Sequence, residues 1–232
     1  MLGIIPARKG SKGLPRKNIK TLNGKPLIQY TLEAALGAKN ISRLVVTTDD
    51  DEIADFCQSW EGVEVPFKRP SDLAGDRAIV IDSFFHLLDW LNQNEGFVPE
   101  SFCVLQPTSP LRISEDIDGA IDLFNARKAG AVLSMYETKP LHWLHHLDLD
   151  SRLEKRKNLF HSADPMEARQ EQPQLYAQNG AVHVFDSQLL RLSRSYYGEG
   201  TFGYVMPKSR SIDIDTLVDF DIAEALLKQS IC

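Results

Sequence analysis

The chain has 232 residues, of which 43% are hydrophobic and 25% are charged, and this ordinary globular composition excludes a disordered, collagen-like or low-complexity protein. Its net charge of −6 excludes a basic footprint for duplex nucleic acid spread over the whole chain. Three cysteines without a Cys-X-X-Cys pair argue against a disulfide framework or a zinc ribbon. No apolar run reaches the ~18 residues that span a bilayer, and no signal-peptide pattern is present, so we expect a soluble protein of the cytoplasm or nucleus.

Apolar runs typical of strands alternate along the chain with stretches of helical period. We predict strands at residues 2–6, 43–48, 63–66, 102–106, 131–136, 181–185 and 203–206. We predict helices at about residues 26–38, 50–60, 78–92, 114–128 and 216–229. This alternation predicts an α/β fold, a mostly parallel sheet flanked by helices. Ligands of such sheets bind at the carboxyl ends of the strands, so the loops that follow strands are the places to look for a site.

One stretch, residues 137–179, interrupts this alternation. It shows no clean period and holds four of the six histidines. An irregular stretch of this length in a compact domain is usually functional or packs on something else. We interpret it as an excursion from the sheet, such as a dimerisation arm.

The loop after the first predicted strand concentrates positive charge. Seven basic residues and no acidic residue lie between positions 8 and 25, which leaves 19 of the 26 basic residues to balance 32 acids elsewhere. Gly10 and Gly13 allow the backbone to approach a ligand closely, and successive amides can form an anion-binding concavity. The spacing matches neither the dinucleotide fingerprint nor the Walker A motif. The loop therefore suits a small polyanion such as a triphosphate; the alternative is a solvated basic loop.

Two further loops carry polar side chains. In Ser211-Ile-Asp213-Ile-Asp215, the period of two places both carboxylates on one face of an extended segment, and such a pair can bind Mg²⁺ that bridges to phosphates. The alternative is the polar face of an edge strand before a helix. At the end of the fourth predicted strand, Gln106, Thr108 and Ser109 offer donors and acceptors for a base or ribose, although a generic turn has the same composition.

Taken together, these loops resemble a known family. Residues 5–18 (IPARKGSKGLPRKN), 105–112 (LQPTSPLR) and 211–216 (SIDIDT) resemble three signatures of the acylneuraminate cytidylyltransferases, the CMP-sialic acid synthetases, in the family's order. The resemblance runs from the first strand to the last helix. It implies one Rossmann-like nucleotidyltransferase domain over residues 1–232, with residues 137–180 as an inserted arm for dimerisation and sugar binding.

The resemblance also implies roles for individual residues. Arg8, Lys17, Asp213 and Asp215 would be catalytic, and the two aspartates would bind Mg²⁺, for which Mn²⁺ can substitute. The residues implied to bind CTP are Arg8, Ser11, Lys12, Lys17, Asn18, Arg69, Gln106 and Thr108. The residues implied to bind the sugar are Gln106, Arg169, Gln170, Asn179, Tyr196 and Tyr197.

The resemblance predicts a cytoplasmic homodimer that binds CTP and a nonulosonic acid, with no nucleic-acid or membrane partner. The anomeric oxygen of a nine-carbon 2-keto sugar acid would attack the α-phosphate of CTP and release pyrophosphate. The sugar end departs from the family pattern, because His142 stands where a lysine is common and the surroundings of Tyr196 and Tyr197 differ. Sialic, legionaminic and pseudaminic acids therefore remain open as acceptors. The rival interpretations are a cytidylyltransferase for the eight-carbon acid Kdo and a non-catalytic nucleotide-sugar-binding protein.

Overall fold

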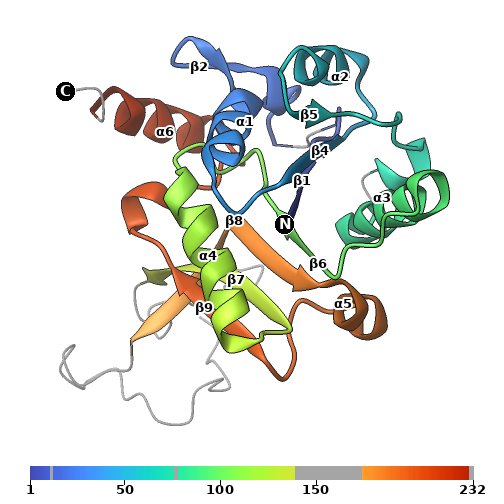
Figure 1. Ribbon diagram of the computed structural model, residues 1–232. Coiled ribbons are helices and arrows are strands. Elements are labelled where there is room, and N and C mark those ends of the chain that lie inside the picture. Colours follow the sequence, from blue (N-terminus) through green and yellow to red (C-terminus); the bar gives the residue numbers. More distant parts are fainter. Residues whose placement is uncertain (11–12, 76–77, 139–173, 230–232) are drawn as a thin grey trace, which may run out of the picture.

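The computed structural model describes residues 1–10, 13–75, 78–138 and 174–229. Within these ranges a seven-stranded sheet runs through the molecule in the order β5-β4-β1-β6-β8-β7-β9 (Figure 1). Its strands are β1 (Leu2–Pro6), β4 (Arg43–Thr47), β5 (Val63–Glu64), β6 (Ser101–Val104), β7 (Ala131–Thr138), β8 (Leu175–Asp186) and β9 (Thr201–Val205). All neighbouring pairs are parallel except those of β8, which is antiparallel to both β6 and β7. The predicted α/β fold with a mostly parallel sheet is confirmed.

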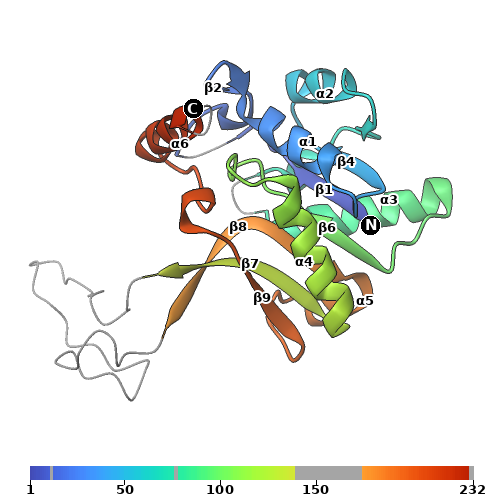
Figure 2. The ribbon, with the colours of Figure 1, turned by 60° about the vertical axis from the view of Figure 1, so that its left-hand side comes forward.

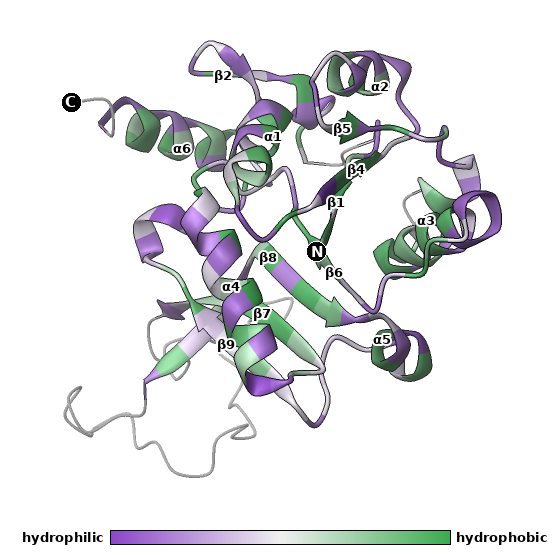
Figure 3. Cartoon of the chain, viewed as in Figure 1, coloured by the Kyte–Doolittle hydropathy of each residue, from purple (hydrophilic) through white to green (hydrophobic). Residues whose placement is uncertain are grey.

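Helices cover both faces of the sheet. They are α1 (Leu27–Gly37), α2 (Asp51–Gln58), α3 (Val80–Glu95), α4 (Ser114–Arg127), α5 (Ser187–Ser193) and α6 (Leu217–Gln229). Successive strand residues point to opposite faces: Ile5 packs in the core under α1, α2 and α4, whereas Ile4 packs in the core under α3 and α5. Figure 3 shows the corresponding pattern, with hydrophobic residues along most of β6 and β8 and both colours on each helix.

A third, smaller core holds the last helix. The hairpin of β2 (Thr21–Leu22) and β3 (Lys25–Pro26) packs with the start of α1 against α6, through Leu22, Leu27 and Phe220. Figure 2 shows α6 and this hairpin together at one end of the molecule. Residues from near both ends of the chain therefore share one core. No helix among the described residues is long and apolar enough to cross a membrane.

The largest departure from the sequence prediction is β8. A strand was predicted only at residues 181–185, but β8 runs from Leu175 to Asp186, and β7 continues to Thr138. The predicted irregular stretch thus begins and ends within paired strands, while residues 139–173 lie outside the described part. The alternation along β8 is broken because the β7–β8 register shifts between Leu133 and Met135, and Gly180 has a φ of +71°. Helix α5 and the β2–β3 hairpin were also not predicted.

A buried arginine ties the sheet to α1 at the carboxyl end of β6. Arg112 is 3% exposed. It donates hydrogen bonds to Ala181 O at 2.6 Å, Gln106 O at 3.2 Å and Thr31 Oγ1 at 2.7 Å. Burial lowers its pKa to about 10, and it forms no ion pair with the described residues. Two nitrogens of the planar guanidinium reach three acceptors that lie on different elements, a geometry that the single nitrogen of a lysine ammonium does not reproduce.

We therefore expect Arg112→Lys to lower the free energy of unfolding by about 2–4 kcal/mol, since buried acceptors lose their donors. Urea denaturation measures this directly. The matched control is Arg127→Lys at the exposed end of α4, which should change stability by no more than about 0.5 kcal/mol. Equal stability of Arg112→Lys and the wild type would mean that these bonds contribute nothing.

Candidate active site

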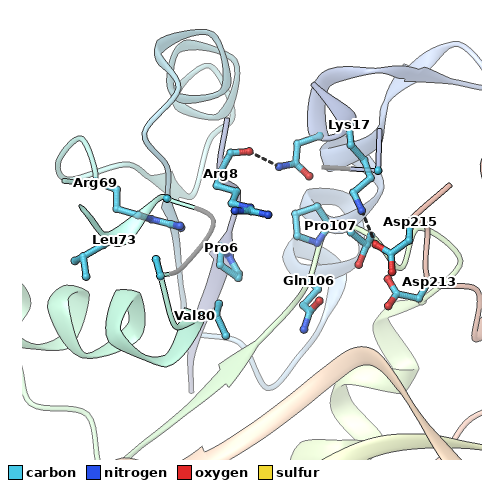
Figure 4. Close-up of a pocket in the computed structure, with 15 residues that line it drawn as sticks. Pro6, Arg8, Lys17, Arg69, Leu73, Val80, Gln106, Pro107, Asp213 and Asp215 are labelled. Carbon is cyan, nitrogen blue, oxygen red and sulfur yellow. Dashed lines mark hydrogen bonds and ion pairs between the residues drawn. The ribbon is translucent and has the colours of Figure 1, made fainter. Parts of the chain in front are cut away.

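A cavity of about 480 Å³ opens at the carboxyl ends of β1 and β6 (Figure 4). The chain segments that follow these strands meet there with the segment between the short helix η5 (Lys208–Arg210) and α6. The lining residues are Pro6, Arg8, Gly13, Lys17, Asn18, Arg69, Leu73, Gly75, Ala78, Val80, Gln106, Pro107, Thr108, Asp213 and Asp215. All three sequence motifs therefore contribute to one cavity, as expected for loops that follow the strands of a parallel sheet.

The basic loop is folded against the protein. Lys17 begins a short 3₁₀ helix, η1 (Lys17–Ile19), and is 8% exposed. Asn18 Nδ2 donates to Arg8 O at 3.0 Å, which closes the loop across its base. Arg16 adopts a left-handed conformation with a φ of 55° and pairs with Glu52 at the start of α2. These contacts argue against the solvated-loop alternative. Ser11 and Lys12 lie outside the described residues.

Gly13 brings this loop into contact with the acidic segment. A Cβ atom at position 13 would lie 2.2 Å from Asp215 O, a distance that no side chain tolerates. Gly10 in the same loop has nothing within 4 Å of its ideal Cβ position. The two glycines therefore differ: only Gly13 is required by a close approach.

Lys17 also joins the basic loop to the acidic segment. Its ammonium donates to Ile214 O and, at 3.0 Å, to Asp215 Oδ1. Ile214 N in turn donates to Thr108 O at 2.9 Å. These contacts connect the basic loop, the acidic segment and the loop after β6.

The isoleucines and the aspartates of the acidic segment lie on opposite faces, as the period of two predicts. Ile214 is fully buried and Ile212 packs against the same small core, while Asp213 and Asp215 line the cavity. The segment lies in a loop before α6 and not in a strand, so the alternative of an edge strand is wrong. Asp219 at the start of α6 accepts from Asp215 N at 3.1 Å, which holds the end of the segment.

The two carboxylates form an electrostatically strained pair. Desolvation raises the pKa of Asp213, the charges of Asp215 and Asp219 raise it further, and the Thr108 hydroxyl and Lys17 oppose the shift. Two nearby carboxylates suit a hard divalent cation such as Mg²⁺. The described residues contain no group of three or more histidine, cysteine or acidic side chains that could hold a metal ion. A cation held here would therefore take its other ligands from water or from a bound phosphate.

The opposite wall of the cavity carries the side chains expected to contact the nucleotide base. Arg69 is 5% exposed, and its Nε donates to Thr47 Oγ1 at 3.1 Å, which fixes it at the end of β4. Burial lowers its pKa to about 10. Gln106 and Thr108 also line the cavity. Gly180 of β8 faces Gln106 and the acidic segment, because a Cβ there would be 3.5 Å from Gln106 Oε1 and 3.7 Å from Asp213 Oδ2.

Two polar residues with expected ligand contacts are instead used inside the protein. Ser109 is 1% exposed and donates to Asn179 O at 3.3 Å, so its hydroxyl is not offered to a ligand. Asn179 is 2% exposed. Its Oδ1 accepts from Ser134 Oγ at 2.5 Å and from Ala181 N at 3.1 Å, and its Nδ2 donates to Ser211 Oγ at 2.9 Å. In place of the expected sugar contact, its side chain holds the irregular part of β8 to the acidic segment.

The two tyrosines implied for the sugar do not line this cavity. Tyr196 packs 4.9 Å from the Phe185 ring, and burial raises its pKa to about 12. Tyr197 is 65% exposed and donates to Gln178 Oε1 at 2.7 Å. Both tyrosines line a separate hollow of about 340 Å³ beside α5. Arg169 and Gln170 lie outside the described residues, so Gln106 alone of the six implied residues is placed in the cavity.

Sequence reasoning missed the apolar side of the cavity and the role of β8. Leu73, Ala78 and Val80 line the wall near the start of α3, and they follow the Lys-Arg-Pro turn with no polar motif to mark them. Gly180 follows an asparagine, and this Asn-Gly pair is a recognisable signal for positive φ. That signal could have predicted a break in the strand at this point.

Comparisons with known proteins agree with this geometry. A family model described as cytidylyltransferase matches residues 2–203. The chain is 36% identical over 230 residues to the CMP-N,N'-diacetyllegionaminic acid synthase of Legionella pneumophila, covering 98% of this chain and 96% of the relative. It is also 34% identical over 225 residues to an N-acylneuraminate cytidylyltransferase of Escherichia coli. That match covers 96% of this chain but 51% of the relative, so this chain spans about half of the relative's length.

Among solved structures, the fold resembles CMP:2-keto-3-deoxy-manno-octonic acid synthetase complexed with CTP, with a TM-score of 0.70 and 17% identity over 99% of this chain and 98% of that one. At this identity the likeness concerns the fold alone. The family model covers most of the chain, and the Legionella relative matches almost all of it at more than 30% identity. The chain therefore belongs to the cytidylyltransferase family and is a CTP-dependent nucleotidyltransferase.

Proposed function

We propose that this enzyme transfers CMP from CTP to the anomeric hydroxyl of a nine-carbon 2-keto-3-deoxy sugar acid, with release of pyrophosphate. The observation that carries the proposal is the meeting of the basic loop and the acidic pair around Lys17 in one cavity. The full-length similarity to a legionaminic acid synthase favours a nonulosonic acid of that type as the acceptor. N-acylneuraminic, pseudaminic and Kdo acids are the competing acceptors.

The proposed role of the basic loop is to bind and neutralise the triphosphate. Transfer of a nucleotidyl group depends mainly on positioning and on charge stabilisation. Arg8 and Lys17 line the cavity with fixed positive charge, and Lys17 is the residue proposed to face the α-phosphate. Ser11 and Lys12 are proposed to add contacts to the phosphates.

The base and ribose would lie on the other side of the cavity. Arg69 and Gln106 are proposed to contact the cytosine, beside the apolar wall. Thr108, which lies against the acidic segment, is proposed to contact CTP from that side. Asn18 is proposed to lie close to the ribose; its bond to Arg8 O would also hold the loop in shape. Gln106, which faces Gly180 of β8 together with Asp213, is proposed to contact the sugar as well.

Asp213 and Asp215 are proposed to hold Mg²⁺, with Mn²⁺ as a substitute, and to bring the anomeric hydroxyl toward the α-phosphate. When bound, the metal would neutralise charge on the phosphates. Arg169 and Gln170 are proposed to supply further sugar contacts, whereas Tyr196 and Tyr197 would reach the sugar only from the separate hollow beside α5. Residues 137–180 are proposed to form the arm of a homodimer, and light scattering of the purified protein would test its mass.

The proposal is tested by pyrophosphate release with CTP and Mg²⁺ against a panel of N-acetylneuraminic, legionaminic, pseudaminic and Kdo acids. We expect turnover with a nonulosonic acid, and the fastest turnover with legionaminic acid or its N,N'-diacetyl form. Calorimetric titration of CTP serves as the control for the nucleotide end. Turnover with Kdo alone would contradict the proposed acceptor, and absence of CTP binding would contradict the whole proposal.

Replacement of one carboxylate separates chemistry from nucleotide binding. Asp215→Asn is expected to lower kcat about a hundredfold or more, because a ligand of the proposed metal ion, which would neutralise charge on the phosphates, is lost, while CTP binding is partly retained. The exposed Asp221→Asn on α6 makes the same charge change outside the cavity and should leave kcat unaltered. Unchanged turnover of Asp215→Asn would remove this residue from the proposed metal site.

The two glycines of the basic loop offer a matched pair. Gly13→Ala is expected to lower kcat/KM by about a hundredfold, since the loop must move away from Asp215 O and small displacements of this kind are costly for catalysis. Gly10→Ala, which meets open space, should retain most of the activity. Thermal melting of both variants checks that the fold is intact. Similar activity of the two variants would show that the close approach at Gly13 is unimportant.

A further inference from the structure

The contact between Lys17 and Asp215 raises a question about when the metal can bind. In the structure the Lys17 ammonium lies 3.0 Å from Asp215 Oδ1 and also donates to Ile214 O. A carboxylate that serves a divalent cation in the reaction is thus already paired with a cation of the protein itself. The inference below rests on the metal site of the proposed function.

The ammonium is held in this position by the fold. The Lys17 side chain is 9% exposed, whereas that of Asp215 is 76% exposed. The backbone of Lys17 lies in η1, where Lys17 N donates to Leu14 O at 3.2 Å. Ile214 O, its second acceptor, belongs to a residue that is completely buried. Lys17 is therefore a fixed counter-ion at the base of the acidic segment, with less freedom than a lysine on the surface.

This arrangement disfavours a free divalent cation. The ammonium occupies an oxygen of Asp215 and adds a positive charge beside the place where a metal ion would sit, which costs binding energy for a second cation. The described residues around it provide two carboxylates but no third metal-ligating side chain. Mg²⁺ also requires six ligands and is commonly held by one or two carboxylates together with substrate phosphates.

A bound triphosphate would change both the pairing of Lys17 with Asp215 and the number of ligands available to the metal. Lys17 lines the cavity beside Arg8, so an α-phosphate there would offer the ammonium an acceptor other than Asp215 Oδ1. The same phosphates would supply oxygen ligands to the metal. We propose that Lys17 is the resident counter-ion of the acidic pair and keeps it from taking a divalent cation until a nucleotide is bound. Metal and nucleotide then promote each other's binding, since such coupling is reciprocal.

The test measures Mn²⁺ binding to the full-length protein without nucleotide, by the electron paramagnetic resonance signal of free Mn²⁺. Lys17→Gln and Lys17→Met are both expected to bind Mn²⁺ about tenfold more tightly than the wild type, because a nearby positive charge is gone. The matched control is Lys25→Gln, which removes a lysine of the same region that pairs with Glu33 at 2.8 Å and should leave Mn²⁺ affinity unchanged. Circular dichroism checks the fold of each variant.

A double variant assigns the gain to the acidic pair. Adding Asp215→Asn to Lys17→Gln is expected to abolish the tighter Mn²⁺ binding. If wild type and both Lys17 variants bind Mn²⁺ equally tightly at a site that Asp215→Asn weakens, the metal site stands and the role of Lys17 is overturned. If no folded variant binds Mn²⁺ through Asp215, the metal assignment itself is overturned, whereas pyrophosphate release with the sugar panel tests the reaction separately.

Discussion

The structure depends on one contact between residues from opposite ends of the chain. Lys17 reaches Ile214 O and Asp215, and Gly13 lies so close to Asp215 O that a Cβ atom would not fit between them. A charge-assisted pair of this kind is useful only where its geometry is held. The central sheet holds it, because β1 leads directly into the basic loop and the small core around Ile214 fixes the acidic segment.

The antiparallel strand β8 serves the same end. Asn179 bonds to Ser134 of β7, to the backbone of Ala181 and to Ser211 at the start of the acidic segment. Because its amide replaces bonds that a regular strand would make, the register shift in β8 leaves no penalty at this residue. The shift carries Gly180 toward Gln106 and Asp213. An irregular strand thus lies against both Gln106 and the acidic side of the cavity.

The sequence predicted which loops line the cavity because their signals are local. A run of basic residues after a strand and a period of two in the acidic segment do not depend on distant partners, and both motifs line the cavity. Asn179 and Ser109 could not be placed in this way. Their polar side chains look available in the sequence, but burial and partners from β7, β8 and the acidic segment decide what they bind. The full length of β8 was hidden for a related reason, since its bulge interrupts the alternation.

The two halves of the proposed reaction also differ in where their residues originate. The described residues proposed for CTP lie directly after β1, β5 and β6, in the parallel half of the sheet. Those proposed for the sugar, apart from Gln106, come from the chain after β7. On these proposed roles the two substrates would meet near Gln106, since a Cβ atom on Gly180 of β8 would lie 3.5 Å from Gln106 Oε1 and 3.7 Å from Asp213 Oδ2.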